Sequence, residues 1–290
     1  MHSVNPEIGC ANPAYPDQPE SSRNLPCATE ALRVSIVITN YNYGRYVEQA
    51  IRSALDQTHG DVEVIVVDDG STDNSLQIIR RYPVQLVEQT NQGLAAARNN
   101  GAALASGDYL LFLDADDILT VTYVSRCLSA LQSASANVAY AYTQMQIFGA
   151  ENALYASRSF EPRALLEGNY IHASALMRKT VFIRVGGYDM TWRHALEDYE
   201  LWVRMLANGY AGTFIREPLL RYRKHGTSRN SLNEREFNHL KWRIRGRHPK
   251  LYLTSCWKNP RKLMKLMMWV VIEKWSRRKT LRVTTWFQLS

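Results

Sequence analysis

Short apolar runs rich in β-branched or aromatic residues alternate with segments of helical periodicity, and this alternation limits what the chain can fold into. Between the runs, apolar residues recur three and four positions apart, the spacing of an amphipathic helix. Continuous apolar strands separated by helices indicate a mostly parallel sheet flanked by helices on both faces. The predicted strands are residues 33–39, 62–67, 84–87, 109–113 and 138–143, with helices at 46–57, 93–105 and 121–131 among those between them.

Polar side chains follow three of these strands at the point where each one ends. Thr39 and Tyr41 come after the first strand, Asp69 after the second, and Asp114 and Asp116 after the fourth. Ligands of open parallel sheets bind outside the carboxyl ends of the strands. We therefore expect these residues to cluster on one edge of the sheet.

The acidic turn after residue 113 holds Asp114, Asp116 and Asp117 within four positions. Carboxylates this close repel one another unless a cation lies between them, and Mg²⁺ or Mn²⁺ is the natural partner for oxygen ligands. A solvated turn that caps the next helix is the alternative. The acidic turn at Asp69 favours the metal site, and Ser71 or Thr72 is expected to cap the helix that follows there.

Several common motifs are missing. The chain has no G-x-G-x-x-G, no G-x-x-x-x-G-K-[ST] and no G-x-S-x-G, which disfavours dinucleotide oxidoreductases, P-loop NTPases and α/β-hydrolases. Its four cysteines form no C-x-x-C pair, which argues against a disulfide framework and against a structural zinc site. Scattered cysteines fit a reducing compartment.

The net charge of +8 is concentrated at the C-terminal end. Residues 237–290 hold 14 Lys and Arg against one acid, Glu273, which leaves 21 basic and 26 acidic residues in 1–236. We predict a disordered, proline-rich leader at 1–30, a catalytic domain at 31–232 and a basic, aromatic helical tail at 233–290.

The tail interleaves tryptophans with lysines and arginines. A basic helix of this kind is typical of segments that lie on an anionic membrane surface, and packing against the catalytic domain is the alternative. No RNA-binding module is recognisable, so no nucleic-acid partner is expected. With no signal peptide and no apolar run near ~18 residues, we expect a cytoplasmic protein, with peripheral contact at the cytoplasmic face of the membrane.

Four motifs in order carry a resemblance to a known family. They are Ser35-Ile-Val-Ile-Thr-Asn-Tyr-Asn42, Val66-Val-Asp-Asp-Gly-Ser71, Asn91-Gln-Gly-Leu-Ala-Ala-Ala-Arg-Asn99 and Phe112-Leu-Asp-Ala-Asp-Asp117. The chain resembles the inverting family 2 glycosyltransferases, whose GT-A fold is a Rossmann-like, mostly parallel sheet flanked by helices. The resemblance extends to Tyr222-Arg-Lys-His225 and implies a nucleotide-sugar donor and a divalent metal, Mn²⁺ or Mg²⁺.

The resemblance also implies roles for the residues of the donor side. Thr39 and Tyr41 would line the nucleotide pocket, with Tyr41 against the base, and Asp69 would accept from a base N–H. Arg98 would shape the base and phosphate pocket, or would have a purely structural role.

For the metal side, the resemblance implies that Asp114 faces the ribose and the metal and that Asp116 is the main metal ligand. His225 would reach the metal or the diphosphate, or would belong to an exposed basic loop.

Asp198, in Leu196-Glu-Asp-Tyr-Glu200, would be the general base by the same resemblance. An inverting transfer needs one carboxylate near the acceptor hydroxyl, opposite the departing diphosphate. Acidic side chains at the start of a helix also stabilise the helix through its dipole, and this purely structural role is the alternative for the cluster.

We therefore expect transfer of a single sugar, from a UDP-sugar on family grounds, to a hydroxyl of a cell-envelope glycan or its lipid-linked precursor. The Q-x-x-R-W box of processive members is absent, which disfavours synthesis of a long polymer. The alternatives are a catalytically inactive sugar-nucleotide-binding protein and a sugar nucleotidyltransferase. The second normally has a glycine- and arginine-rich phosphate loop that residues 39–45 do not supply.

Overall fold

The computed structural model describes residues 32–192, 195–225, 233–256 and 259–287. The prediction made for residues 1–30 lies outside the described part of the chain.

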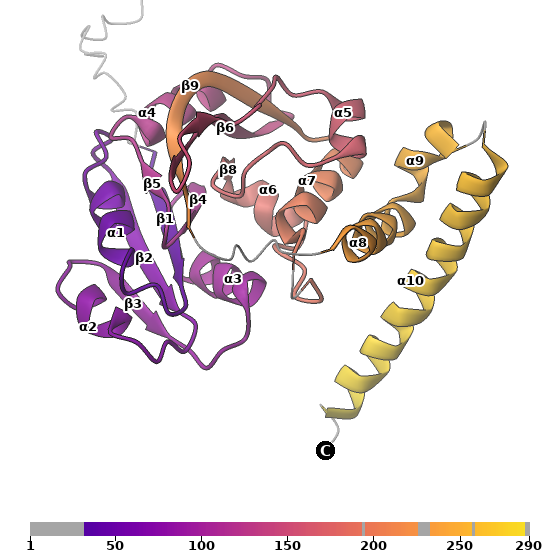
Figure 1. The fold of residues 1–290 in the computed structure, drawn as a ribbon, viewed down its shortest axis with the longest axis horizontal. Coiled ribbons are helices and arrows are strands. Elements are labelled where there is room, and N and C mark those ends of the chain that lie inside the picture. The colour runs from indigo at the N-terminus through magenta and orange to yellow at the C-terminus, as the bar shows by residue number, and fades with distance from the viewer. Residues whose placement is uncertain (1–31, 193–194, 226–232, 257–258, 288–290) are drawn as a thin grey trace, which may run out of the picture. The chain divides into compact units, whose positions relative to one another are not determined.

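Four parallel strands form the first half of the sheet, in the order β3-β2-β1-β4 (Figure 1). Their register pairs Asn40 with Asp68 and Thr39 with Asp114, so the carboxyl ends of three strands lie level. The predicted order of strands and helices is confirmed here. Strands β1, β2 and β4 are mostly apolar and largely buried, as expected of strands covered on both faces, whereas β3 at the edge is only partly buried. The bounds are β1 Val34–Asn40, β2 Val62–Asp68, β3 Gln85–Glu88 and β4 Tyr109–Asp114.

The second half of the sheet is mixed rather than parallel. The short strand β8 (Leu176–Arg178) lies between β4 and β6 (Val138–Gly149) and is antiparallel to both. Strand β9 (Ala211–Lys224) runs parallel to β6, and β5 (Ile118–Leu119) and β7 (Ala153–Leu154) add antiparallel pairs at β9 and β6.

Strand β9 spans two short, mostly apolar runs, at 214–215 and 219–222, that are separated in the sequence by charged residues and a proline. It continues through Pro218, which pairs with Gln144 where the register with β6 shifts. Proline has no N–H to donate to a ladder, so it is tolerated at such an irregularity. The interruption in the sequence pattern is a bulge within one strand.

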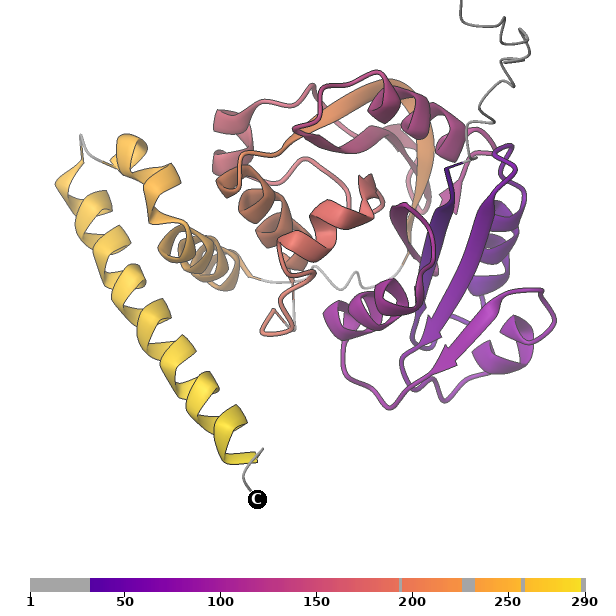
Figure 2. The same ribbon diagram turned by 180° about the vertical axis from the view of Figure 1, so that it is seen from behind.

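Helices cover both faces of the sheet (Figure 2). One face packs against α1 (Val47–Leu55), α2 (Ser75–Ile79) and α4 (Tyr123–Gln132), and the other against α3 (Leu94–Leu104), α5 (Pro162–Glu167), α6 (Lys179–Arg184) and α7 (Glu197–Ala207). The α/β fold class is therefore confirmed.

Two local features of this layer depend on individual residues. A Cβ on Gly101 of α3 would lie 2.3 Å from a methyl of Val37, so only glycine allows α3 to approach β1 this closely. The prediction that Ser71 or Thr72 caps α2 is wrong, because α2 begins at Ser75 after an N-cap Asn74 whose side chain makes no capping bond.

The expected helical tail forms α8 (Glu234–Arg247), α9 (Pro249–Cys256) and α10 (Pro260–Phe287). Asn233 and Glu236 make a reciprocal capping box at the start of α8. Trp242 and Trp269 are buried in the cluster that also holds α7, so packing on the preceding fold occurs. The domain boundary at residue 232 stays a prediction. None of the described helices is long and apolar enough to cross a membrane.

Candidate active site

A cavity of about 1260 Å³ opens at the carboxyl edge of β1, β2 and β4. Residues from α7, β9 and the loop 169–174 close it from the other side. The expectation that the acidic turns meet at this edge is therefore confirmed by their positions. All eight site residues suggested by the sequence line this cavity: Thr39, Tyr41, Asp69, Arg98, Asp114, Asp116, Asp198 and His225.

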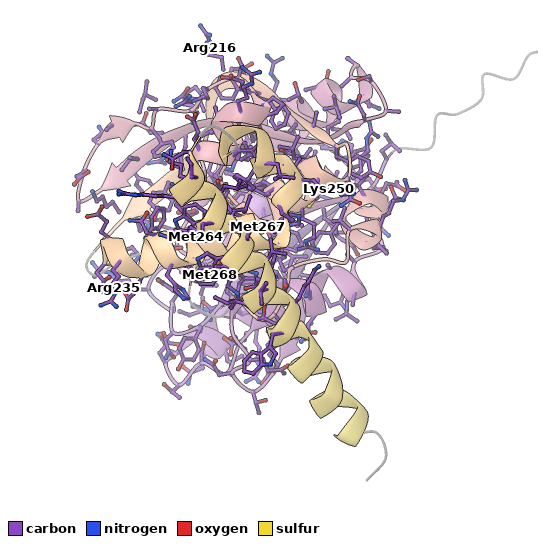
Figure 3. The ribbon with its side chains drawn as sticks, turned by 90° about the vertical axis from the view of Figure 1, so that its right-hand side faces the viewer. Arg216, Arg235, Lys250, Met264, Met267 and Met268 are labelled. Atoms are coloured by element: carbon purple, nitrogen blue, oxygen red, sulfur yellow. The ribbon has the colours of Figure 1, made fainter. Side chains whose placement is uncertain are left out.

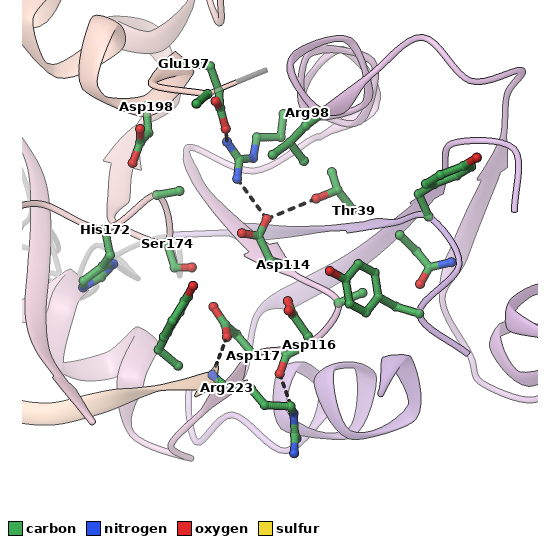
Figure 4. Close-up of a pocket in the computed structure, with 18 of the residues that line it drawn as sticks. Thr39, Arg98, Asp114, Asp116, Asp117, His172, Ser174, Glu197, Asp198 and Arg223 are labelled. Atoms are coloured by element: carbon green, nitrogen blue, oxygen red, sulfur yellow. Dashed lines mark hydrogen bonds and ion pairs between the residues drawn. The ribbon is translucent and has the colours of Figure 1, made fainter. Parts of the chain in front are cut away.

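Arg98 joins the two sides of the cavity and is only 1% exposed. Its Nη2 lies 2.9 Å from Asp114 Oδ1 and its Nη1 3.1 Å from Glu197 Oε1. Figure 4 shows Arg98 between these two carboxylates. Burial disfavours its charge, but Asp114, Tyr188 and Glu197 outweigh that and raise the pKa of Arg98. Thr39 Oγ1 also donates to Asp114, at 3.4 Å. The guanidinium is therefore held by carboxylates, and it fixes where Asp114 points.

Asp116 lies beside a histidine that also lines the cavity. Its Oδ2 lies 2.9 Å from His225 Nε2, and the rings of Tyr46 and Tyr43 flank this imidazole at 4.8 and 5.7 Å between centroids. Burial first, and then the nearby charge of Asp114, raise the pKa of Asp116. An additional cation at this carboxylate would relieve both effects.

Asp117 also lines the cavity but is only 3% exposed. Its Oδ1 accepts from the backbone N–H of Arg223 at 2.9 Å, and Arg223 Nε donates to the carbonyl of Asp116 at 2.9 Å. Burial, with Asp116 and Asp114 nearby, raises the pKa of Asp117 well above its usual range. This carboxyl group fastens the acidic turn to β9, which sets the position of Asp116.

Asp69 holds the loop that leads into α3. Its Oδ1 accepts from Gln89 Nε2 and from the backbone N–H of Gln92, both at 2.7 Å, and its Oδ2 accepts from the N–H of Gly93 at 2.8 Å. A carboxylate offers about four acceptor positions. One position on Asp69 therefore remains for a ligand, and the neighbouring ring of Tyr41 is 45% exposed.

Asp198 lies at the start of α7, on the side of the cavity opposite β1. Its Oδ2 accepts from Asn169 Nδ2 at 3.0 Å and its Oδ1 from the backbone N–H of Tyr199 at 2.6 Å. Removal from water and the charge of Glu197 raise the pKa of Asp198 to about 7, although Arg98 opposes the shift. This carboxyl group can therefore exchange a proton near neutral pH.

Two residues that shape the site were not among those suggested by the sequence. Glu197 is the second partner of Arg98, and its place in an acidic helix start was the available signal. Asn169 orients Asp198 from a loop without any recognisable motif, so nothing in the sequence pointed to it.

The side chains in the cavity could supply part of the ligand shell of a metal ion, but not all of it. Within the described ranges, no three His, Cys, Asp or Glu side chains converge as a complete metal cage. Asp116 and His225 offer oxygen and nitrogen donors side by side, with Asp114 next to them. Mg²⁺ and similar ions are often held by one or two carboxylates while phosphates and water complete the shell.

An α/β sheet with a large polar cavity outside its strand ends places this chain among the α/β proteins that bind their ligand at that edge. The family identification follows from a sequence comparison. The model described as "Glycosyl transferase family 2" matches residues 35–200, more than half of the chain. The chain belongs to this family, and the predicted glycosyltransferase class is confirmed.

Bacterial relatives extend this result. An uncharacterized glycosyltransferase of a Nostoc strain is 43% identical over 108 residues, which is 35% of this chain and 34% of the relative. The putative glycosyltransferase EpsE of Bacillus subtilis is 28% identical over 66% of this chain and 73% of its own length. The putative teichuronic acid biosynthesis glycosyltransferase TuaG of B. subtilis is also 28% identical, over 66% of this chain and 78% of its own.

Solved structures share the fold at low identity. Residues 1–349 of S. aureus TarS in complex with UDP-GlcNAc superpose with a TM-score of 0.60 at 16% identity, covering 77% of this chain and 73% of that one. The mannosyltransferase PcManGT from Pyrobaculum calidifontis, in complex with GDP-Man and Mn²⁺, gives 0.54 at 17% identity over 90% and 82%.

Proposed function

We propose that this chain transfers one sugar from a nucleoside-diphosphate sugar to an acceptor hydroxyl, with inversion at the anomeric carbon and with a divalent metal at the donor. The observation that carries the proposal is the position of Asp198. Asp198, whose surroundings raise its pKa to about 7, lines the same cavity as the Asp116–His225 pair. A single displacement requires a base on the acceptor side, and the Asp116–His225 pair would hold the metal that offsets charge on the leaving diphosphate.

In the proposed reaction the Asp198 carboxylate accepts the proton of the acceptor hydroxyl while that oxygen attacks the anomeric carbon. The bond from this carbon to the β-phosphate oxygen breaks, and the diphosphate leaves with the electron pair. One displacement inverts the anomeric configuration. With its pKa of about 7, Asp198 is ionised in a substantial fraction of molecules at neutral pH and is still basic enough to hold the proton.

The remaining residues position the donor. Thr39 and Tyr41 would line the nucleotide, and the open acceptor position of Asp69 would take a base N–H. Arg98 would act through Asp114, which it holds in place. A metal bound by Asp116 and His225, with Asp114 beside it, would offset negative charge on the diphosphate.

For the substrates, we propose a UDP-sugar donor and a hydroxyl of a cell-envelope glycan or its lipid-linked precursor as acceptor. The UDP-GlcNAc complex of TarS supports the donor, and the name of TuaG supports a cell-envelope glycan. The GDP-Man complex of PcManGT makes GDP-sugars the second donor class to test. The expected cytoplasmic location stays a prediction.

Released UDP or GDP, measured over a panel of donors with Mn²⁺ present, tests the proposal on the full chain. We expect one donor to be turned over, EDTA to stop turnover, and Asp116→Ala to remove it in folded protein. Asp56→Ala changes an exposed aspartate at the C-cap of α1 and serves as the matched control. Turnover that survives EDTA or Asp116→Ala would contradict the metal-dependent mechanism.

The same assay separates the alternatives. A catalytically inactive binding protein would bind a nucleotide sugar without releasing nucleoside diphosphate. A nucleotidyltransferase would release pyrophosphate from a nucleoside triphosphate, and the family match argues against this activity.

A further inference from the structure

Helix α10 carries apolar side chains on two opposite faces. The inward face presents Leu266, Trp269 and Glu273, spaced three and four apart, and all three are buried. A Cβ on Gly246 of α8 would lie 2.8 Å from the backbone of Trp269, which shows how closely the two helices approach. The apolar side chains of this face account for the packing of the tail on the preceding fold.

The outward face forms a second stripe, which we call the outer stripe. Its spacing of three, four, seven, eight and eleven positions from the first residue is that of a single helix face. Figure 3 looks onto this side of α10, where Met264, Met267 and Met268 project away from α8. The stripe consists of Met264, Met267, Met268, Val271, Ile272 and Trp275, each between 40% and 72% exposed.

Two stripes on one helix explain why its sequence shows no single amphipathic pattern. The inward stripe has a partner in α8. The outer stripe makes six large apolar side chains accessible in succession, which is unusual for a surface that remains in water. Scattered exposed apolar residues need no explanation, but a continuous stripe of this length needs an occupant.

Charge around the outer stripe indicates the chemistry of that occupant. At 100° per residue, Arg261 lies along one edge of the stripe and Lys274 along the other, and both are exposed. Lys265 lies on the same side as Arg261, with its Nζ 4.7 Å from the ring centroid of Trp242 on α8. The one acid in the sequence of α10, Glu273, is turned inward, where Arg243 and Arg247 bind it at 2.9 Å. An apolar stripe with basic edges matches acyl chains below anionic headgroups.

We propose that the outer stripe of α10 docks on the surface of an anionic lipid bilayer, with Met264 to Trp275 at the acyl boundary and the basic edges at the headgroups. This partner goes beyond the transfer reaction and does not depend on it. A second copy of the chain fits less well, because a symmetric contact through this stripe would bring basic edges against basic edges.

Vesicle flotation of the full chain tests this docking. Wild type is expected to float with vesicles of phosphatidylcholine and phosphatidylglycerol, and to float much less with phosphatidylcholine alone or at high salt. The variant M264Q/M268Q/V271Q keeps the charge and is expected to weaken binding on the order of 100-fold. The matched control V121Q/L154Q/I183Q changes three equally exposed apolar residues outside the tail and should float as wild type does.

A second pair of variants tests the basic edges. R261Q/K274Q is expected to weaken binding to the anionic vesicles by about tenfold or more, whereas R81Q/R163Q, which removes two exposed charges elsewhere, should have no such effect. Circular dichroism and nucleotide-sugar turnover without lipid should match wild type in all four variants.

The proposal is overturned if wild type does not float, or if the α10 variants float as their controls do. It is also overturned if light scattering shows a dimer that M264Q/M268Q/V271Q converts to monomers while vesicle binding is unchanged. That result would identify a second copy of the chain as the occupant.

Discussion

Two acidic clusters face each other across the cavity, and each holds three carboxyl groups within four residues. One is Asp114, Asp116 and Asp117 after β4, and the other is Glu197, Asp198 and Glu200 at the start of α7. In each cluster one member is buried and fixed to neighbouring structure. Asp117 accepts from the backbone of Arg223, and Glu200 pairs with Arg204 Nη2 at 2.8 Å.

Arg98 links the clusters by binding one member of each, Asp114 and Glu197. The clusters therefore share a cation and occupy a fixed relative position. They differ in their third members. Asp116 faces His225, a group that can itself bind a metal, whereas Asp198 faces Asn169, whose amide cannot take up a proton at neutral pH. Two clusters of the same acid content therefore have different surroundings, which fits the metal-binding role that we propose for Asp116 and the proton-accepting role that we propose for Asp198.

The largest expected effect is at Asp198, the base that we propose. Asp198→Asn should lower transfer by about 10²–10⁴-fold, because the variant has no base for the acceptor hydroxyl. Binding of the nucleoside diphosphate, followed by calorimetry, should stay within a few-fold of wild type. Lost binding would instead assign Asp198 a structural role.

Removing Arg98, the cation that both acidic clusters share, should affect both sides of the cavity. Arg98→Met leaves Asp114 and Glu197 without their partner, and loss of one side of a buried ion pair costs about 3–5 kcal/mol of stability. Denaturant unfolding measures this cost. The exposed pair Arg33–Asp61 offers a control, since Arg33→Met should change stability by less than about 1 kcal/mol.

His225→Ala tests the metal-facing wall. It should weaken the apparent Mn²⁺ affinity of donor turnover by about 10–100-fold, with less effect on the rate at saturating metal. His59→Ala, a change at a histidine that bonds the carbonyl of Leu32, is the control. Equal metal dependence in wild type and His225→Ala would remove His225 from the metal site.

The pH dependence of wild type should reflect the raised pKa of Asp198. Transfer is expected to rise as pH increases through about 7, because the base must be ionised. Stability should change in the opposite direction. An unfolded aspartate loses its proton near pH ~3.9, so the stabilisation present at lower pH is lost as pH rises through about 7. Urea unfolding at several pH values should show wild type losing stability relative to Asp198→Asn over that window.

The smallest expected effect is at Asn169. Its amide stabilises the ionised form of Asp198, so Asn169→Ala should raise the pKa of this base and move the rising limb of the pH–rate profile to higher pH by up to about one unit. An unchanged pH–rate profile with a lower rate would mean that Asn169 contributes to the site in another way.

The sequence predicted much of the side of the cavity at the edge of β1, β2 and β4, and less of the side that α7, β9 and the loop 169–174 form. Buried parallel strands are continuous apolar runs, and the edge rule then brings Asp69, Asp114 and Asp116 together. The antiparallel β8 is three residues long and carries no usable period. The bond from Asn169 to Asp198 depends on the tertiary path of a loop. In α10, an inward and an outward apolar stripe together obscure the amphipathic pattern.

The contacts that complete the cavity join distant parts of the chain. Arg98 and Glu197 are 99 positions apart, and Asp116 and His225 are 109 positions apart. Contacts of such separation form late, since closing long loops has an entropic cost that other contacts must first offset. A nascent chain folded only as far as Asp117 would therefore hold the acidic turn without His225 and without the opposite side of the cavity. Catalytic competence should be one of the last properties this protein acquires as it folds.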